Sequence, residues 1–237
     1  MKLSGPIYLL KRNAKRLARE EGIELNVALE RIAMAEGFKN WSLLAAKYAS
    51  SSSAAKLYAG LKHGDMMLIG ARPGRGKTLL ALGIAAEALK QGKAGMFFTL
   101  EYTEAEVLER IDMIGIPTEH VGAAFNIDCS DHICADYIID RSRSAAPGTV
   151  IIIDYLQLMD QKREHPPLTE QVSALKSFAE SSGSAIVLIS QIARSYDPST
   201  KSVPDLTDVR MPNPIDLAMF TKTHFIGDHS AASVAKH

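Results

Sequence analysis

The sequence predicts an α/β fold in which helices flank a mostly parallel central sheet, with a small three-helix module before it. Three observations predict this architecture. From Leu61 onward, apolar runs typical of buried strands alternate with helical stretches, as they do in βαβ units. A glycine-rich segment at residues 70–78 stands between one such run and a helix-forming stretch. The chain has 237 residues, which is enough for one such domain and a small appendage.

The first 50 residues are predicted to form a small basic helical module. Apolar residues recur at helical spacing over residues 7–21, with five basic residues between them: Lys11, Arg12, Lys15, Arg16 and Arg19. Gly22 and Gly37 end the first two helices, and a third contains Trp41. Residues 1–60 hold ten basic and five acidic residues. This excess indicates either a nucleic-acid or acidic partner or solvated helix faces, and the composition leaves both open.

The composition then marks the limits of the larger domain. A run of four serines predicts a linker over residues 51–60. The α/β domain is expected over residues 61–227, and a flexible tail over residues 228–237. The expected strands are Asp65–Ile69, Ala94–Thr99, Ala123–Asp128, Val150–Asp154, Ala185–Ser190 and Leu217–Thr221. The expected helices are Thr78–Gln91, Thr103–Met113, His132–Ser144 and Thr169–Ser181.

The segment Gly70–Thr78 has the residues of a loop that binds a nucleoside triphosphate. Backbone N–H groups of a glycine-rich turn and the N-terminus of the next helix bind phosphates. Lys77 is expected to reach the β- and γ-phosphates of ATP, and the hydroxyl of Thr78 to coordinate Mg²⁺. Ala71 stands where the general pattern has its first glycine, but the strand, loop and helix follow in the required order. The residues expected to bind the nucleotide are Ala71, Arg72, Pro73, Gly74, Arg75, Gly76, Lys77, Thr78 and Leu79.

A carboxylate follows another apolar run that predicts a buried strand. Residues 148–153 are mostly apolar and β-branched, and Asp154 follows them. Ligands of open α/β sheets lie at the carboxyl ends of the strands, so Asp154 is expected to hold Mg²⁺ together with Thr78. An aspartate at a strand end is also a common turn former. Its position after the phosphate loop, with two expected strands between them, favours the metal role.

Four motifs in order resemble one family. They are Ala71–Thr78, Thr99-Leu-Glu101, Ile153-Asp-Tyr-Leu-Gln-Leu-Met159 and Ser190-Gln-x-x-Arg-Ser195. In order and spacing they resemble the ATPase domain of the bacterial replicative DnaB-type helicases, which has a RecA-like P-loop fold. The resemblance covers about residues 60–227. It implies a DNA motor that assembles as a hexamer, hydrolyses ATP at subunit boundaries and moves on single-stranded DNA.

The resemblance also implies roles for four further residues. Glu101 resembles the catalytic glutamate that polarises the attacking water, a role suited to a carboxylate just past a strand end. Gln191 resembles the sensor of the γ-phosphate. Lys222 and His224 stand where the family has a Lys-x-Arg pair, on a late hairpin that reaches a neighbouring subunit's nucleotide. Since histidine is mostly neutral near pH 7, we expect a contact through His224 to be weaker than one through arginine.

Two further segments depart from the family. The loop at residues 192–215 corresponds to the loop that lines the DNA channel, but its basic residues are nearly balanced by acidic ones. The preceding loop, with Lys162 and Arg163, is similarly mixed. The family's N-terminal collar, which recruits primase, is expected to be absent, with the three-helix module in its place. The sequence does not say what that module binds.

Three functions therefore stay open at this point. The first is a ring helicase that unwinds duplex DNA. The second is a RecA-like ATPase that translocates or switches without unwinding, and the third is a nucleotide-gated switch acting on a partner of residues 1–50. Cys129 and Cys134 are expected to be reduced thiols rather than metal ligands. With no membrane-spanning stretch and no signal peptide expected, the sequence predicts a cytoplasmic protein.

Overall fold

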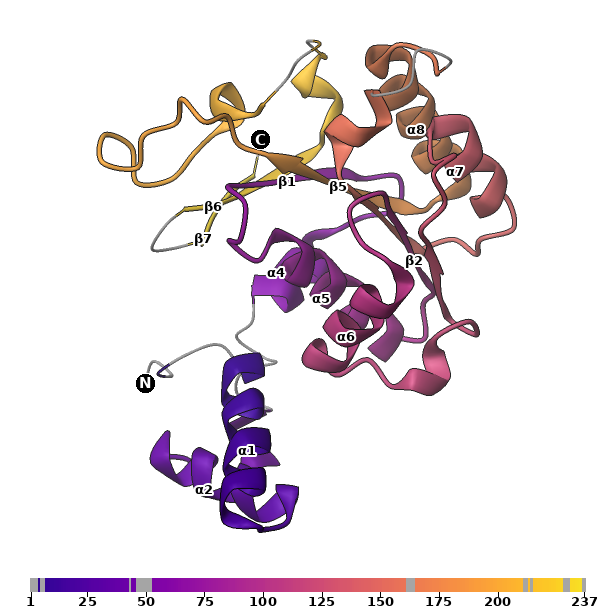
Figure 1. The fold of residues 1–237 in the computed structure, drawn as a ribbon. Coiled ribbons are helices and arrows are strands. Elements are labelled where there is room, and N and C mark those ends of the chain that lie inside the picture. The colour runs from indigo at the N-terminus through magenta and orange to yellow at the C-terminus, as the bar shows by residue number, and fades with distance from the viewer. Residues whose placement is uncertain are drawn as a thin grey trace. The chain divides into compact units, whose positions relative to one another are not determined.

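The computed structural model divides the chain into two compact units, residues 1–56 and 57–237. It describes residues 4, 7–42, 44–45, 53–160, 165–210, 213, 215–227 and 231–235 (Figure 1). The division falls within the expected linker. The linker is not a loop, however, because helix α4 covers Ser53–Gly60. Alanine and lysine are strong helix formers, which outweighs the serines that precede them.

The smaller unit is built from short helices around a small apolar core. Helix α1 covers Ile7–Glu21 and helix α2 covers Leu25–Ala35. Residues 41–42 and 44–45 are also helical, and residues 46–50 lie outside the described part. Thus the first two expected helices are confirmed, as is the described part of the third. The buried side chains Leu10, Ala33 and Leu44 form the core, against which Trp41 packs.

The larger unit contains a seven-stranded sheet. Its strands are β1 (Met66–Ala71), β2 (Gly95–Thr99), β3 (Phe125–Asp128), β4 (Val150–Asp154), β5 (Ala185–Gln191), β6 (Lys222–Ile226) and β7 (Ala231–Ala235). They lie in the order β3-β2-β4-β5-β1-β6-β7. Every pair is parallel except the last, β6 with β7. The mostly parallel sheet that the sequence predicts is confirmed.

Helices cover both faces of this sheet. Helices α5 (Lys77–Lys90) and α6 (Glu104–Ile114) lie on one face, and α7 (Ala135–Ser142) and α8 (Leu168–Ser182) lie on the other (Figure 1). The central strands β1 and β4 are therefore buried along their whole length. This explains their continuous apolar sequences. Short 3₁₀ helices within the described ranges, η1–η4, cover Thr118–His120, Leu156–Asp160, Leu206–Asp208 and Leu217–Met219.

Two of the expected elements are wrong. Residues expected to form a strand at Leu217–Thr221 form η4 instead, because the Asp216 carboxylate accepts a hydrogen bond from the backbone N–H of Ala218 at 2.8 Å. The strand begins only at Lys222. The expected flexible tail at 228–237 contains β7 over residues 231–235, while 228–230 and 236–237 lie outside the described part.

Close packing fixes one residue at the end of β1. A side chain at Gly70 would place its Cβ 2.5 Å from a ring atom of Phe225 on the neighbouring strand β6. Heavy atoms do not approach so closely, so the ring occupies the space that any larger residue would need. Gly70 therefore serves sheet packing, and the phosphate loop begins after it.

Candidate nucleotide and metal site

Four neighbouring strands deliver the predicted site residues to one edge of the sheet. In the sheet order, β2, β4, β5 and β1 lie side by side. Glu101 follows β2, Asp154 ends β4, Gln191 ends β5 and the phosphate loop follows β1. Because these strands are parallel, their carboxyl ends meet at the same edge. The structure thus brings together residues that lie up to 120 positions apart in the chain.

The phosphate loop has the backbone of an anion-binding turn. Gly74 and Gly76 have φ values of +75° and +80°, which side-chain-bearing residues rarely adopt. Gly76 is the N-cap of α5, and no side chain caps that helix end. The first N–H groups of a helix point along its axis and carry partial positive charge, so they attract phosphate. Residues 73–76 are exposed, whereas Lys77 is 4% exposed at the start of α5.

The residues predicted to hold the metal contact each other. The hydroxyl of Thr78 donates a hydrogen bond to Oδ2 of Asp154 at 2.7 Å, and both side chains are buried. The other carboxylate oxygen, Oδ1, is buried and has no hydrogen-bond partner among the described residues. Burial raises the pKa of Asp154 to about 6, against the opposing effects of the Thr78 hydroxyl and the Lys77 ammonium.

A buried acceptor without a partner is costly, and a cation removes the cost. A hydroxyl and a carboxylate are oxygen ligands of the kind that Mg²⁺ takes, usually one or two from protein and the rest from phosphates and water. The chemistry of Thr78 and Asp154 therefore fits this ion.

Glu101 stands at the open side of the same edge. Its backbone N–H donates to the hydroxyl of buried Thr99 at 3.1 Å, and Thr99 pairs with Asp154 across β2 and β4. The backbone N–H of Leu100 also donates to the Asp154 carbonyl at 3.3 Å. The Glu101 side chain is exposed, and its charge helps to raise the pKa of Asp154. The carboxylate is thus close to Asp154 and open to water.

Sequence reasoning missed two residues beside this carboxylate. The guanidinium carbon of Arg110 lies 3.8 Å from the centre of the Tyr102 ring. Burial, followed by the charges of Glu101 and Asp154, raises the pKa of Tyr102, while Thr78 and Arg110 lower it. Tyr102 could have been found from the sequence, because it directly follows Glu101. Arg110 could not be found there, because its position depends on the direction of α6.

Gln191 is held by a second glutamine to which the sequence motifs assigned no role. The backbone N–H of Gln191 donates to Oε1 of Gln157 at 3.3 Å. Gln157 lies on η2, three residues after Asp154, and is 8% exposed. The side chain of Gln191 lies close enough to Tyr155 to lower the pKa of its hydroxyl, which burial raises. The end of β5 is thereby tied to the segment that carries Asp154.

Lys222 and His224 do not join this edge. Lys222 begins β6, opposite Met67 near the start of β1, and its ammonium lies 3.3 Å from the Asp65 carboxylate. His224 is 2% exposed, and within the part of the chain that the structure describes neither ring nitrogen has a hydrogen-bond partner. Burial lowers the pKa of His224. Although β6 and β7 form a hairpin, this strand is part of the sheet. The expectation that the two side chains reach a neighbouring nucleotide does not fit this placement.

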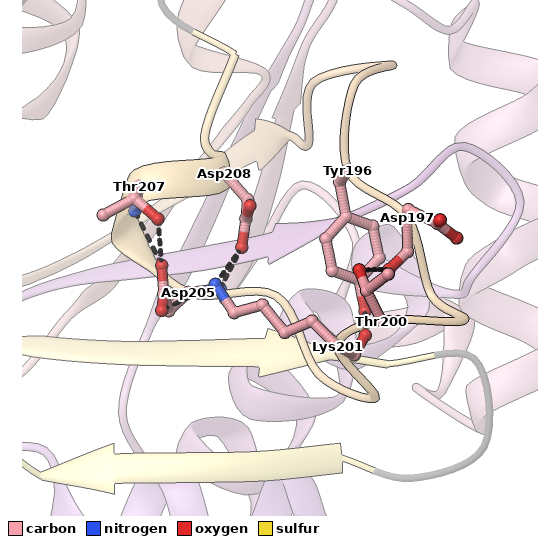
Figure 2. A network of polar contacts seen from close by, with 7 residues as sticks. All are labelled: Tyr196, Asp197, Thr200, Lys201, Asp205, Thr207 and Asp208. Atoms are coloured by element: carbon pink, nitrogen blue, oxygen red, sulfur yellow. Dashed lines mark hydrogen bonds and ion pairs between the residues drawn. The ribbon is translucent and has the colours of Figure 1, made fainter.

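The loop from Ile192 to Arg210 consists largely of internally paired side chains. The Lys201 ammonium lies 2.6 Å from the Asp205 carboxylate and 2.5 Å from that of Asp208 (Figure 2). Asp205 and Asp208 also cap η3 through backbone N–H groups. The nearly balanced charge expected from the sequence is thus explained by ion pairs within the loop. Lys162 and Arg163 of the preceding loop lie outside the described residues.

The comparisons with known proteins fit this geometry. The model of the DnaB-like helicase C-terminal domain family matches residues 52–116 and 118–218. The chain belongs to this family. A replicative DNA helicase DnaB of Mycoplasma genitalium is 28% identical over 190 residues, which cover 65% of this chain and 41% of the relative. The chain therefore spans well under half the length of such relatives.

Solved structures share the fold. A solved ATPase domain superposes with a TM-score of 0.58 at 17% identity, over 82% of this chain and 92% of that one. A structure of a DnaB-like replicative helicase and its interactions with primase gives a TM-score of 0.57 at 19% identity, over 92% of this chain and 65% of that one. The RecA-like fold that the sequence resemblance implies is confirmed.

Two further kinds of feature, a cluster of metal-binding side chains and a membrane-spanning helix, are not found among the described residues. No group of three or more histidine, cysteine or acidic residues there is arranged to hold a metal. Cys129 and Cys134 are free thiols. Within the described ranges, no helix is both long enough and apolar enough to cross a bilayer.

Proposed function

We propose that this chain is the ATP-hydrolysing motor domain of a DnaB-type DNA helicase. It binds ATP with Mg²⁺ at the carboxyl edge of the sheet, works as a homo-oligomer, with a hexamer favoured, and acts on single-stranded DNA in the cytoplasm. The observation that carries the proposal is the convergence of Lys77, Thr78, Asp154 and Glu101 at the ends of β1, β4 and β2.

Each residue has one task in this proposal. Lys77 and the N-terminus of α5 bind the phosphates and offset their charge. Thr78 and Asp154 hold Mg²⁺, which offsets the charge that develops on the phosphate oxygens during transfer. Glu101 orients the attacking water from the open side of the edge, and Gln191 senses the γ-phosphate. Arg110 lies over the ring of Tyr102, the residue that follows Glu101, and this contact is proposed to hold that segment in place.

The ATPase proposal is tested by measuring phosphate release from Mg²⁺·ATP with wild-type protein and Glu101→Gln. We expect Glu101→Gln to lose activity on the order of 100-fold or more while it still binds ATP, because the amide cannot accept a proton from water. Glu104→Gln is the matched control, since Glu104 is an exposed carboxylate three residues away on α6. Wild-type hydrolysis by Glu101→Gln would remove this residue from the mechanism.

The same assay separates the motor from its alternatives. Stimulation of phosphate release by single-stranded DNA supports a motor, and strand separation of a forked duplex then supports unwinding. Hydrolysis that DNA leaves unchanged supports an ATPase switch. Assembly is measured by light scattering with a non-hydrolysable ATP analogue, and specific activity should rise with protein concentration as rings form. A strict monomer with constant specific activity contradicts the ring.

The small basic unit is proposed to contact nucleic acid or an acidic partner. Arg12, Arg16 and Arg19 are exposed on α1, and the ion pair of Arg16 with Glu20, at 3.7 Å, is a weak surface pair. We expect replacement of the three arginines by glutamine to weaken DNA binding and to flatten its salt dependence. Replacement by lysine keeps the charge and should keep both. An unchanged salt slope in the glutamine variant would show that these arginines are only solvated.

A further inference from the structure

Gln157 forms three hydrogen bonds at the point where the metal segment, the end of β5 and the following loop meet. Its Nε2 donates to the Ser190 hydroxyl at 2.7 Å and to the Arg210 carbonyl at 2.6 Å. Its Oε1 accepts from the backbone N–H of Gln191 at 3.3 Å. The side chain is 8% exposed and Ser190 is fully buried. The buried Gln157 amide thus uses both of its N–H donors and its oxygen. Its bonds reach the chain on both sides of one loop.

The loop that Gln157 contacts is closed at its base by backbone pairing. Ile192 and Val209 form an isolated antiparallel bridge. Around that bridge, the N–H of Arg210 donates to the Gln191 carbonyl at 2.8 Å, and the N–H of Ala193 donates to the Asp208 carbonyl at 2.8 Å. The end of β5 and the return of the loop at Arg210 therefore form a short ladder, and Gln157 is bonded to both of its sides.

The body of the loop holds its own shape. Buried Tyr196 donates its hydroxyl to the Lys201 carbonyl at 2.6 Å, and Lys201 contacts Asp205 and Asp208, as Figure 2 shows. A loop held in this way moves as one body rather than residue by residue. A displacement at its base is then passed to its tip.

Gln157 also lies close in the chain to Asp154, the carboxylate proposed to hold the metal. Asp154 ends β4, and only Tyr155 and Leu156 separate it from Gln157. Leu156 is fully buried in the main core, which leaves the connection little freedom. A shift of Asp154 is therefore passed to Gln157 over three residues.

We propose that Gln157 is the positioning residue that links the metal segment to Gln191 and to the Ile192–Arg210 loop, so that nucleotide occupancy sets the position of that loop. This proposal deepens the proposed ATPase function and rests on it. Gln157 touches neither nucleotide nor metal in this assignment. It acts through Gln191 and Arg210.

Limited trypsin digestion of the full chain tests the link without requiring hydrolysis. Trypsin cleaves after Arg194, Lys201 and Arg210, all in the loop. In wild-type protein we expect a non-hydrolysable ATP analogue with Mg²⁺ to slow these cleavages. Gln157→Leu keeps the approximate volume and removes all three bonds, so cleavage should be about tenfold faster and insensitive to the analogue.

Gln171→Leu is the matched control. Gln171 is also buried, and its amide also joins separate segments, accepting from the Ala135 N–H and donating to the carbonyls of Met159 and Pro166. It makes no bond to the loop, so its variant should lose stability yet keep the wild-type cleavage pattern and its response to the analogue. Wild-type cleavage in Gln157→Leu, or equal loosening in both variants, overturns the proposal.

Gln157→Glu gives a second readout and serves if Gln157→Leu does not fold. A carboxylate keeps the acceptor for Gln191 but loses the donor to the Arg210 carbonyl, and protonation restores that donor. We expect its phosphate release relative to wild type to rise as the pH falls from 8 to 6, with KM for ATP within about threefold of wild type. A relative rate independent of pH overturns the proposal. If wild-type protein hydrolyses no ATP, the proposed function fails while the digestion still decides the link.

Discussion

Two loops leave the carboxyl edge of the sheet from neighbouring strands, one after β1 and one after β5. The phosphate loop at residues 71–78 contains two glycines with positive φ, and residues 73–76 are exposed. The loop from Ile192 to Arg210 contains no glycine, and its side chains bond to one another. One loop offers its backbone to a ligand. In the other, polar groups already have partners within the loop.

The difference gives a criterion for telling a loop that binds a ligand from a loop that passes on a movement. Among the described residues, the start of α5, which no side chain caps, and Asp154 Oδ1, which lacks a hydrogen-bond partner, are the features that favour ligand binding. Groups that are already paired hold a shape and can pass on a movement. By this criterion, we expect different roles for Lys77, at the start of α5, and Lys201, within the Ile192–Arg210 loop.

The largest expected effect breaks or confirms this contrast directly. We expect Lys77→Met to reduce ATP hydrolysis by a factor on the order of 100 or more, because it removes the buried ammonium that is expected to reach the β- and γ-phosphates. Lys201→Met should change the basal rate by less than about threefold, since the Lys201 ammonium forms ion pairs with Asp205 and Asp208. Phosphate release measures both, and equal losses would refute the division of roles.

The second prediction concerns the support beneath the phosphate loop. His224 on β6 is buried opposite Ile69 of β1, so His224→Arg would place a permanent charge in an apolar layer. We expect a loss of about 3 kcal/mol or more in the free energy of unfolding. Denaturant titration measures it, with Lys222→Arg as the control that keeps the ion pair with Asp65. A stable His224→Arg with raised turnover would instead support the contact in trans.

The third prediction loosens the transmitting loop alone. Tyr196→Phe removes the hydrogen bond from the buried hydroxyl to the Lys201 carbonyl. We expect a loss of about 1 kcal/mol in stability and faster trypsin cleavage after Lys201. ATP affinity, measured with a fluorescent nucleotide, should stay at the wild-type value. A weaker affinity would mean that the phosphate loop depends on the shape of its neighbour.

The smallest effect is a pH dependence confined to the same loop. Hydrogen bonds from Lys201 and Thr207 lower the pKa of Asp205 to about 2, from an ordinary value of 3.8. A lowered carboxyl pKa contributes stability above the unfolded pKa, and that stability is lost as the pH falls from about 4 to 2. Because the pair is half exposed, the contribution is about 1 kcal/mol or less. Thermal midpoints of wild type and Asp205→Asn should converge over this range.

Most strands and the phosphate loop could be predicted from the sequence, because short-range patterns determine them. Five of the six expected strands and the phosphate loop could be placed because apolar runs and turn residues act over a few positions. The contact of Thr78 with Asp154 follows from parallel strands sharing an edge. By contrast, a strand was expected at Leu217–Thr221, but the cap at Asp216 favours the 3₁₀ helix η4 there and competes locally with the apolar pattern.

The parts of the site that the sequence leaves undecided depend on long-range packing. Lys222 and His224 alternate with Thr223 and Phe225, a pattern that fits an exposed hairpin as well as an inner strand. Only the pairing of β6 with β1 decides between them. Gln157 was visible within a motif, but its partners Ser190 and Arg210 lie 33 and 53 residues away.

Gly70 and Phe225 have a consequence for how this sequence can diverge. They lie 155 positions apart, yet the ring fills the space beside the glycine. In any lineage, a larger residue at 70 is tolerated only after the aromatic ring at 225 has been replaced by something smaller. Substitutions at the two positions should therefore be accepted in a fixed order. A library that randomises both should recover small–large and large–small combinations, and should lack those with two large residues.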